Sequence, residues 1–300
     1  MTYTNFSTIF LIFLAHVQKK VYLCAEFHTI KAKGERLLAK KMKTVVITGG
    51  SSGIGKATAE LFAEQGWRVY EWSRSGQSSD KITHIACDVT KPEETKAAAR
   101  KVIEEAGQID VFISNAGFGI SGAVEFTSSE DAHRQMEVNF FGALNGVQAV
   151  LPYMREKKAG RIIFTSSVAA VLSIPYQSFY SASKAAINAL ALALQNEVRA
   201  FGIHVSVLMP GDVSTGFTAA RKKSEEGIDA YGNIRKAVSA MEKDEQGGMS
   251  PRQMAKELYS IATCACPAPQ YIGGAQYKLF CFLDRILPKR LVNWIVGKLY

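Results

Sequence analysis

The chain has 300 residues, which suits one large α/β domain or two small ones. Its hydrophobic content of 47% is ordinary for a globular protein and excludes a collagen, a coiled coil or a low-complexity chain. The formal charge of +9 lies at the ends: seven basic against two acidic residues give residues 1–42 a charge of +5, and five against one give residues 271–300 a charge of +4. The neutral centre argues against a nucleic-acid partner, because such a domain would carry its own basic stripe.

The N-terminal 41 residues are expected to be an extension outside the main core. Residues 8–17 are apolar, but this run is shorter than the ~20 residues that a membrane helix needs. Met42 directly precedes the first convincing strand. Five irregularly spaced cysteines do not resemble a disulfide framework, and Cys264 and Cys266 are too close for a zinc knuckle. We therefore predict a cytoplasmic protein without a metal site.

From Lys43 onward, short strands rich in Val and Ile alternate with longer helical patterns, which is typical of βαβ units. The prediction is a single Rossmann-type domain over residues 42–275, with a doubly wound, parallel, seven-stranded sheet and helices on both faces. The expected strands are Thr44–Thr48, Arg68–Ser73, Thr83–Ala86, Val111–Ser114, Arg161–Ser166, His204–Met209 and Gln270–Ile272. The expected helices are Gly53–Gln65, Pro92–Ala106, His133–Glu156, Phe179–Ala200 and Pro251–Thr263.

The first strand runs into a glycine-rich turn and then a helix, which predicts a phosphate cradle. Glycines let the backbone approach a pyrophosphate, and the helix N-terminus offers free N–H groups. The residues expected to hold the cofactor in this turn are Gly49, Ser51, Ser52, Gly53, Ile54 and Gly55.

The ends of the next strands are expected to meet the adenosine half of the cofactor. Ser73 stands where an acid would hold the ribose of NAD, and Arg74 follows it, which favours the 2′-phosphate of NADP. Glu71 lies inside the strand and is expected to point elsewhere. Asp88 and Val89 follow the third strand, and the small-residue segment Asn115, Ala116 and Gly117 follows the fourth.

Tyr180 and Lys184 are one turn apart at the start of a helix and share a face. A free tyrosine titrates near pH ~10, and a neighbouring ammonium is expected to lower the pKa of Tyr180 toward the working range. Ser167 ends the fifth strand, where its hydroxyl can hold a substrate oxygen, and Asn139 in the preceding helix can steady a water. All of these strand ends open onto one crevice.

These motifs, in this order and spacing, resemble the short-chain dehydrogenase/reductase family over residues 43–275. The resemblance implies a catalytic tetrad of Asn139, Ser167, Tyr180 and Lys184, with Tyr180 as the acid/base and Lys184 also holding the nicotinamide ribose. It adds Pro210, Gly211, Val213 and Thr215 as cofactor contacts, and a homodimer or homotetramer built through the two long central helices. Two departures are Ser114, where the family often has Asn, and Ser52, where many NADP-preferring members carry a basic residue.

The substrate is expected to be a hydrophobic ketone or secondary alcohol, such as a steroid, a retinoid or a lipid-derived carbonyl. The predicted pocket wall includes Phe118, Tyr176, Met209 and Phe217, and the polar segment 216–249 is a candidate lid. The apolar and basic tail 276–300 suggests peripheral membrane contact, although packing on the pocket mouth or on a partner subunit is an equal alternative. Rival functions are a 3-oxoacyl-thioester reductase, a non-catalytic dinucleotide sensor and a sugar-nucleotide epimerase. The complete tetrad argues against the sensor, and the glycine spacing argues against the epimerase.

Overall fold

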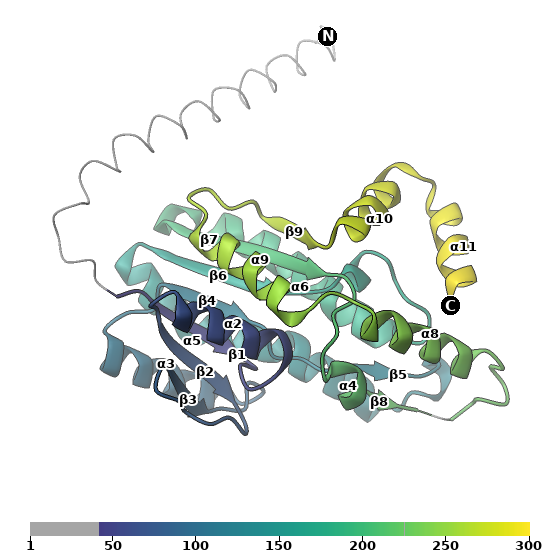
Figure 1. Ribbon diagram of the computed structural model, residues 1–300, viewed down its shortest axis with the longest axis horizontal. Helices are drawn as coiled ribbons and strands as arrows, with labels where there is room; N and C mark the ends of the chain where they lie inside the picture. Colours follow the sequence, from purple (N-terminus) through teal and green to yellow (C-terminus); the bar gives the residue numbers. More distant parts are fainter. Residues whose placement is uncertain (1–41, 225) are drawn as a thin grey trace, which may run out of the picture. The chain divides into compact units, whose positions relative to one another are not determined.

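Seven parallel strands form one sheet in the computed structural model, which describes residues 42–224 and 226–300 (Figure 1). The strand order is β3-β2-β1-β4-β6-β7-β9. The strands are β1 (Thr44–Thr48), β2 (Arg68–Ser73), β3 (Ile82–Ala86), β4 (Val111–Ser114), β6 (Gly160–Thr165), β7 (Ile203–Pro210) and β9 (Gln270–Gly273). The predicted sheet is confirmed, and every strand end lies within one residue of its expected place. The predicted extension, residues 1–41, lies outside the described residues.

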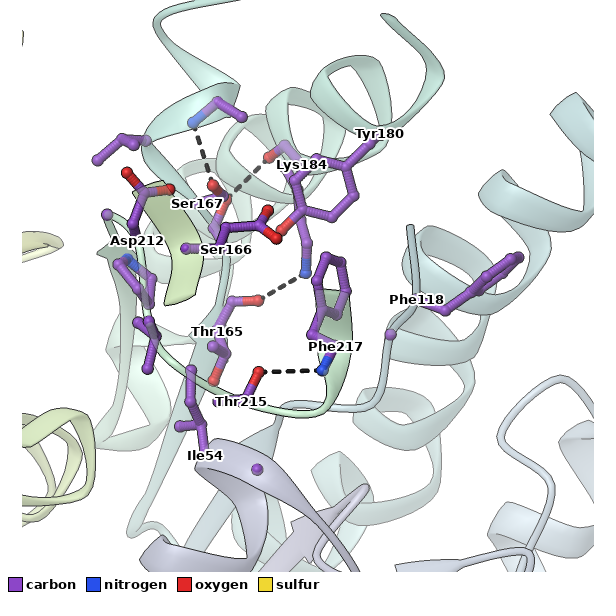
Figure 2. A pocket seen from close by; sticks show the side chains of 18 of the residues that line it. Ile54, Phe118, Thr165, Ser166, Ser167, Tyr180, Lys184, Asp212, Thr215 and Phe217 are labelled. Atoms are coloured by element: carbon purple, nitrogen blue, oxygen red, sulfur yellow. Dashed lines mark hydrogen bonds between the residues drawn. The ribbon is translucent and has the colours of Figure 1, made fainter. Parts of the chain in front are cut away.

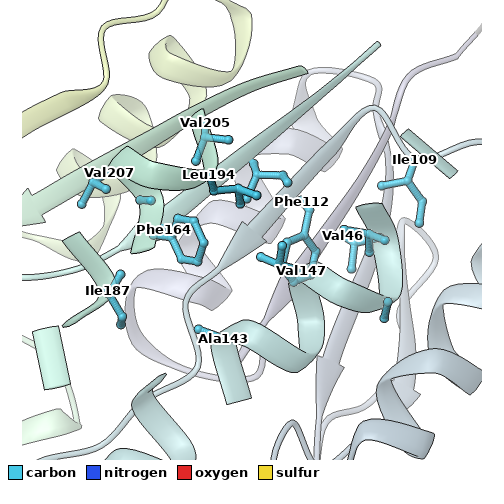
Figure 3. Packing of buried hydrophobic residues seen from close by; sticks show 14 of the residues in the cluster. Val46, Ile109, Phe112, Ala143, Val147, Phe164, Ile187, Leu194, Val205 and Val207 are labelled. Atoms are coloured by element: carbon cyan, nitrogen blue, oxygen red, sulfur yellow. The ribbon is translucent and has the colours of Figure 1, made fainter. Parts of the chain in front are cut away.

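Both faces of the sheet are covered, which explains why its strands are apolar along their whole length. All five residues of β1 are buried. Val46 faces one core cluster, while Val45 and Ile47 face the other, because successive side chains of a strand point to opposite faces. The first cluster packs α3 (Pro92–Ala106), α5 (Gly142–Lys157) and α6 (Ser178–Val198) against the sheet (Figure 3). The second packs α2 (Gly53–Glu64) and α9 (Pro251–Thr263).

The helix expected over His133–Glu156 is present, but it begins at Ser129 and contains a π-helical turn that the sequence did not predict. The chain forms α4 (Ser129–Met136), then the π-helical turn η3 (Glu137–Phe141), then α5. The first of these helices begins early because the Ser128 side chain caps it, accepting a hydrogen bond from Asp131 N at 3.1 Å. A π-turn of this kind often marks a functional site, and Asn139 lies within it.

Two regions contain regular structure that the sequence patterns did not predict. The segment after β7 holds α7 (Phe217–Ala220), β8 (Lys222–Lys223) and α8 (Ile234–Gln246). Its strand β8 pairs in parallel with β5 (Ile120–Ser121), which ties this segment to the loop after β4. The tail consists of α10 (Ala275–Ile286) and α11 (Lys289–Leu299). Among the described helices, none combines the length and the hydropathy needed to cross a bilayer.

The order of the strands places a crevice between β1 and β4. From β1 the sheet grows toward β2 and β3 in one direction and toward β4, β6, β7 and β9 in the other. The loops that follow β1 and β4 therefore separate at their carboxyl ends, and ligands of open α/β sheets bind at such a reversal.

Candidate active site

The turn after β1 depends on its glycines, as Gly49 and Gly55 illustrate. Gly49 has a left-handed φ of +66°, and its N–H donates to Trp72 O at 2.7 Å. A side chain at Gly55 would overlap the carbonyl oxygen of Gly49. The turn therefore brings bare backbone to the first residues of α2, whose N–H groups favour an anion such as a phosphate.

Hydrogen bonds join this turn to the end of β4. Thr48 Oγ1 accepts from Asn115 N at 2.9 Å and from Ala116 N at 3.0 Å, and Asn115 Nδ2 donates back to Thr48 O at 3.2 Å. The contact holds the two loops at the sheet reversal in one arrangement. A Cβ atom at Gly49 would lie only 3.0 Å from Ala116 Cα, so the two backbones approach closely.

A cavity of about 470 Å³ opens at this end of the sheet (Figure 2). It brings together most of the residues predicted to bind cofactor or substrate. Those that line it are Gly49, Ser52, Gly53, Ile54, Asn115, Ala116, Gly117, Phe118, Ser167, Tyr180, Lys184, Pro210, Gly211, Val213, Thr215 and Phe217.

Tyr180 and Ser167 meet in this cavity from α6 and from the end of β6. Ser167 begins the short helix η4 (Val168–Ala170), and its Oγ accepts from Ala169 N at 3.1 Å. Its hydroxyl also hydrogen-bonds the Tyr180 phenol. The Tyr180 ring lies 5.6 Å from the Phe217 ring, centroid to centroid.

Lys184 is only 5% exposed. Its ammonium donates to Thr165 O at 2.9 Å and lies 5.7 Å from the centroid of the Tyr180 ring. Burial penalises the charged form and lowers the pKa of Lys184 to about 8.

The pKa of Tyr180 differs from expectation, because it is raised to about 12 rather than lowered. Burial is the largest cause. The hydrogen bond with Ser167 lowers this pKa, and the charge of Glu245 raises it further. The Lys184 ammonium does not offset burial here, since it is directed at Thr165 O. At neutral pH Tyr180 is therefore a phenol with a proton to give.

Asn139 lies behind the cavity wall rather than in it. The fully buried side chain donates from Nδ2 to Phe118 O at 3.1 Å and to Ser183 Oγ at 3.0 Å, and its Oδ1 accepts from Phe118 N at 3.0 Å. It thus fastens the loop after β4 to the helix that carries Tyr180.

Five residues predicted to bind the cofactor do not line the cavity: Ser51, Gly55, Arg74, Asp88 and Val89. Ser51 and Gly55 belong to the glycine turn and α2, and Val89 is buried after β3. Arg74 is exposed at the end of β2. Burial raises the pKa of Asp88, but hydrogen bonds from Thr90 and the charge of Arg74 outweigh it, so the net pKa lies below its usual value.

Glu71 lies beside the glycine turn. Its carboxylate is buried, pairs with His84 Nδ1 and accepts from Ser73 Oγ at 3.3 Å. A Cβ atom at Gly50 would lie 2.6 Å from Glu71 Cβ. The carboxylate is thus held by His84 of β3, and Glu71 does not line the cavity.

Two residues predicted for the pocket wall do not line the cavity. The Tyr176 hydroxyl bonds Asn233, and its ring lies 6.4 Å from the Tyr231 ring, so it faces the segment after β7. Met209 is 2% exposed, and its sulfur accepts from Asn188 Nδ2 at 3.2 Å in the main core.

Sequence reasoning missed several cavity residues. Met241 and Glu245 come from α8. The buried residues of this helix, Ile234, Ala237 and Met241, recur at the spacing of one helix face, and this apolar periodicity within the polar segment was the signal that could have predicted it. Tyr300 also lines the cavity, and no sequence signal pointed to it.

The cavity also contains two carboxyl groups. Asp212 accepts from the Tyr277 hydroxyl, while Glu245 pairs with the buried Arg221 and accepts from Thr218 Oγ1 at 2.6 Å. Burial is the main cause of a raised pKa at Asp212. Asp212 and Glu245 therefore add two carboxyl groups to the lining, and Glu245 has Arg221 as its counter-ion.

Comparisons with known proteins agree with this geometry. The family model described as short chain dehydrogenase matches residues 43–226. The chain is 39% identical to the 3-ketodihydrosphingosine reductase of Bacteroides thetaiotaomicron, over 85% of this chain and 97% of that protein. It is 30% identical to a probable short-chain type dehydrogenase/reductase, VdlC, of Helicobacter pylori, over 81% and 92% of the two chains. The crystal structure of a short-chain dehydrogenase from Streptomyces avermitilis superposes with a TM-score of 0.76 at 29% identity and covers 87% of this chain and 98% of its own.

The pKa of Lys184 provides a direct test of the buried site. We expect the amine to titrate near pH 8, ammonium below and neutral amine above, because burial favours the neutral form. NMR of protein labelled at lysine Cε should show one resonance with its midpoint near pH 8, and this resonance should be absent in Lys184→Met. A Lys184 resonance whose midpoint lies well above pH 8 would contradict the description of the site.

Proposed function

The chain belongs to the short-chain dehydrogenase family, and from this premise we propose that it is an NADP(H)-dependent reductase of hydrophobic, lipid-derived ketones. The observation that carries the proposal is the convergence of Ser167, Tyr180 and Lys184 on one cavity with the glycine turn. The complete set of these groups disfavours the alternative of a non-catalytic dinucleotide sensor.

The residues present fit a nicotinamide dinucleotide. Backbone approaches closely at Gly49 and Ala116, which leaves a cradle that side chains would fill. The glycine turn would hold the pyrophosphate, Asn115 to Gly117 would lie against the ribose, and Pro210 to Thr215 would meet the carboxamide. When bound, the cofactor supplies the hydride for the carbonyl carbon.

The protein's own groups supply the proton and orient the carbonyl. Ser167 can donate a hydrogen bond to the substrate oxygen and thereby polarise the carbonyl group. Tyr180, whose pKa is about 12, is protonated at neutral pH and can give its proton to that oxygen as negative charge develops. The Lys184 ammonium, present below about pH 8, places a positive charge in the same cavity as the resulting phenolate. At neutral pH the site therefore holds the proton that a reduction consumes.

The residues that line the cavity indicate which class of substrate fits it. Phe118, Ile174, Phe217 and Met241 give it an apolar wall that suits an alkyl chain. The Asp212 carboxyl adds a hydrogen-bonding group to the lining, which suits the amino group of an amino ketone, while Glu245 already has Arg221 as its counter-ion. The ketone named for the Bacteroides relative, 3-ketodihydrosphingosine, has a long chain and an amino group beside its carbonyl. We therefore favour a long-chain amino ketone over a 3-oxoacyl thioester.

The preference for NADP(H) rests on Arg74, which is exposed beside the adenosine end and acts on Asp88. A planar guanidinium suits the 2′-phosphate. The proposal also includes a homodimer or homotetramer through the long central helices. Phe141 and Leu192, at 44% and 40% exposure, offer apolar surface there.

Replacing the acid tests the mechanism. Tyr180→Phe should lower kcat for ketone reduction by about 10²–10⁴-fold, because it removes only the proton donor. The Kd for NADPH, read by fluorescence, should change by less than about threefold, since the ring remains. Tyr259→Phe, on α9 and far from the cavity, is the matched control. Wild-type turnover in Tyr180→Phe would reject the assignment.

Replacing the proposed phosphate ligand tests the cofactor. Arg74→Ala should raise the KM for NADPH by roughly tenfold or more, since a hydrogen bond to a charged group contributes about 1.5–3 kcal/mol. The KM for NADH should hardly move. Arg100→Ala, exposed on α3, is the control and should affect neither. An equal rise in both KM values would contradict the NADP preference.

A further inference from the structure

An apolar surface covers the outside of α10 and α11. Of the fourteen large hydrophobic residues that are exposed in the described chain, eight lie in these two helices. Six of them define what we call the tail face: Leu279, Phe282, Ile286, Leu291, Trp294 and Ile295, each between 38% and 61% exposed. Apolar side chains concentrated in this way mark an interaction site rather than ordinary surface.

Helical spacing shows that this surface is not a by-product of loose packing. In α10 the buried positions are Tyr277, Cys281 and Asp284, and the tail-face residues occupy the opposite side. In α11 the half-buried Val292 and Val296 face Val171 and Leu172 of the main domain. Each helix thus already has an inward face, and its outward face is apolar as well, where a helix bathed in water would be polar.

The charges around the tail face are almost all positive. Lys278, Arg285, Arg290 and Lys298 are exposed, and none forms an ion pair with any residue that the structure describes. Asp284 is the single acid of residues 275–300, and Lys289 Nζ neutralises it at 2.5 Å. Apolar side chains bordered by cations match a surface that is apolar inside and anionic outside. Two copies of the tail face would instead bring like charges together.

The tail face also borders the candidate active site. Tyr300 directly follows α11 and lines the cavity together with Met241 and Glu245 of α8. Figure 1 shows α11 close to α8, next to the segment after β7. An apolar molecule held against the tail face would therefore lie near the cavity wall.

We propose that the tail face docks on an anionic lipid surface as a peripheral contact, so that the cavity receives its apolar ketone from the bilayer. The docking rests on the tail itself, and only the delivery of substrate rests on the proposed function. Trp294 and the flanking side chains would enter the interface, while Lys and Arg reach the lipid headgroups.

Vesicle co-sedimentation of the full chain tests the docking. We expect the bound fraction to be much higher on vesicles of phosphatidylcholine with phosphatidylserine than on phosphatidylcholine alone, and to fall with added salt. Trp294→Ser should weaken binding roughly tenfold or more, because it removes a large apolar side chain that the lipid interface would bury. Lys298→Glu should weaken binding to the anionic vesicles in particular.

Matched controls are Val124→Ser, which removes another apolar residue that is 58% exposed, and Lys256→Glu, which removes an exposed cation on α9. Both should bind like the wild type. Equal binding by Trp294→Ser and the wild type would overturn the proposal. A second result would also overturn it: a wild type that does not bind vesicles but forms a dimer, with Trp294→Ser abolishing the dimer. The tail face would then contact a second copy of the chain.

Turnover of a short, water-soluble ketone separates this proposal from the proposed function. Trp294→Ser should retain that turnover, because the side chain lies outside the cavity lining. It should lose turnover of a long-chain ketone presented in anionic vesicles. A wild type that reduces neither ketone but binds vesicles would reject the proposed function and leave the docking standing.

Discussion

The hydrogen bond from the Lys184 ammonium to Thr165 O is the interaction on which the site depends. It places a buried cation at the end of β6, next to Ser167 and one helical turn from Tyr180. The same burial raises the pKa of Tyr180 and lowers that of Lys184. A proton donor and a readily neutralised cation therefore share one cavity, and their preferred states at neutral pH suit the reduction of a carbonyl group.

The fold makes this arrangement possible through two structural constraints. Thr48 and Asn115 join the loops that separate at the sheet reversal, so the glycine turn faces the cavity. Asn139, in the π-turn before α5, fastens the loop at Phe118 to α6 and so holds Tyr180 and Lys184 in register with that loop. The hydrogen bonds of these three residues keep the groups that line the cavity in position, and such positioning contributes to catalysis.

The sequence was sufficient to predict the sheet and most of the cavity, because strands buried on both faces and a glycine turn at a strand end have strong local patterns. It was insufficient where tertiary contacts decide. The π-turn at Asn139 depends on bonds to Phe118 and Ser183, which no periodicity reveals. The pKa of Tyr180 depends on burial, which outweighed the cation that the spacing suggested. Tyr300 reaches the cavity only because α10 and α11 fold back over the domain.

In the proposed reaction, hydride reaches the carbonyl carbon and a proton reaches the carbonyl oxygen of one ketone beside Tyr180. Mass spectrometry of the alcohol formed from a long-chain amino ketone and NADPH carrying deuterium in both positions of the nicotinamide C4 tests this most directly. The account predicts one deuterium on the former carbonyl carbon, with NADPH consumed in equal amount. Consumption of NADPH without deuterium in the alcohol, or no alcohol from any long-chain ketone, would contradict it.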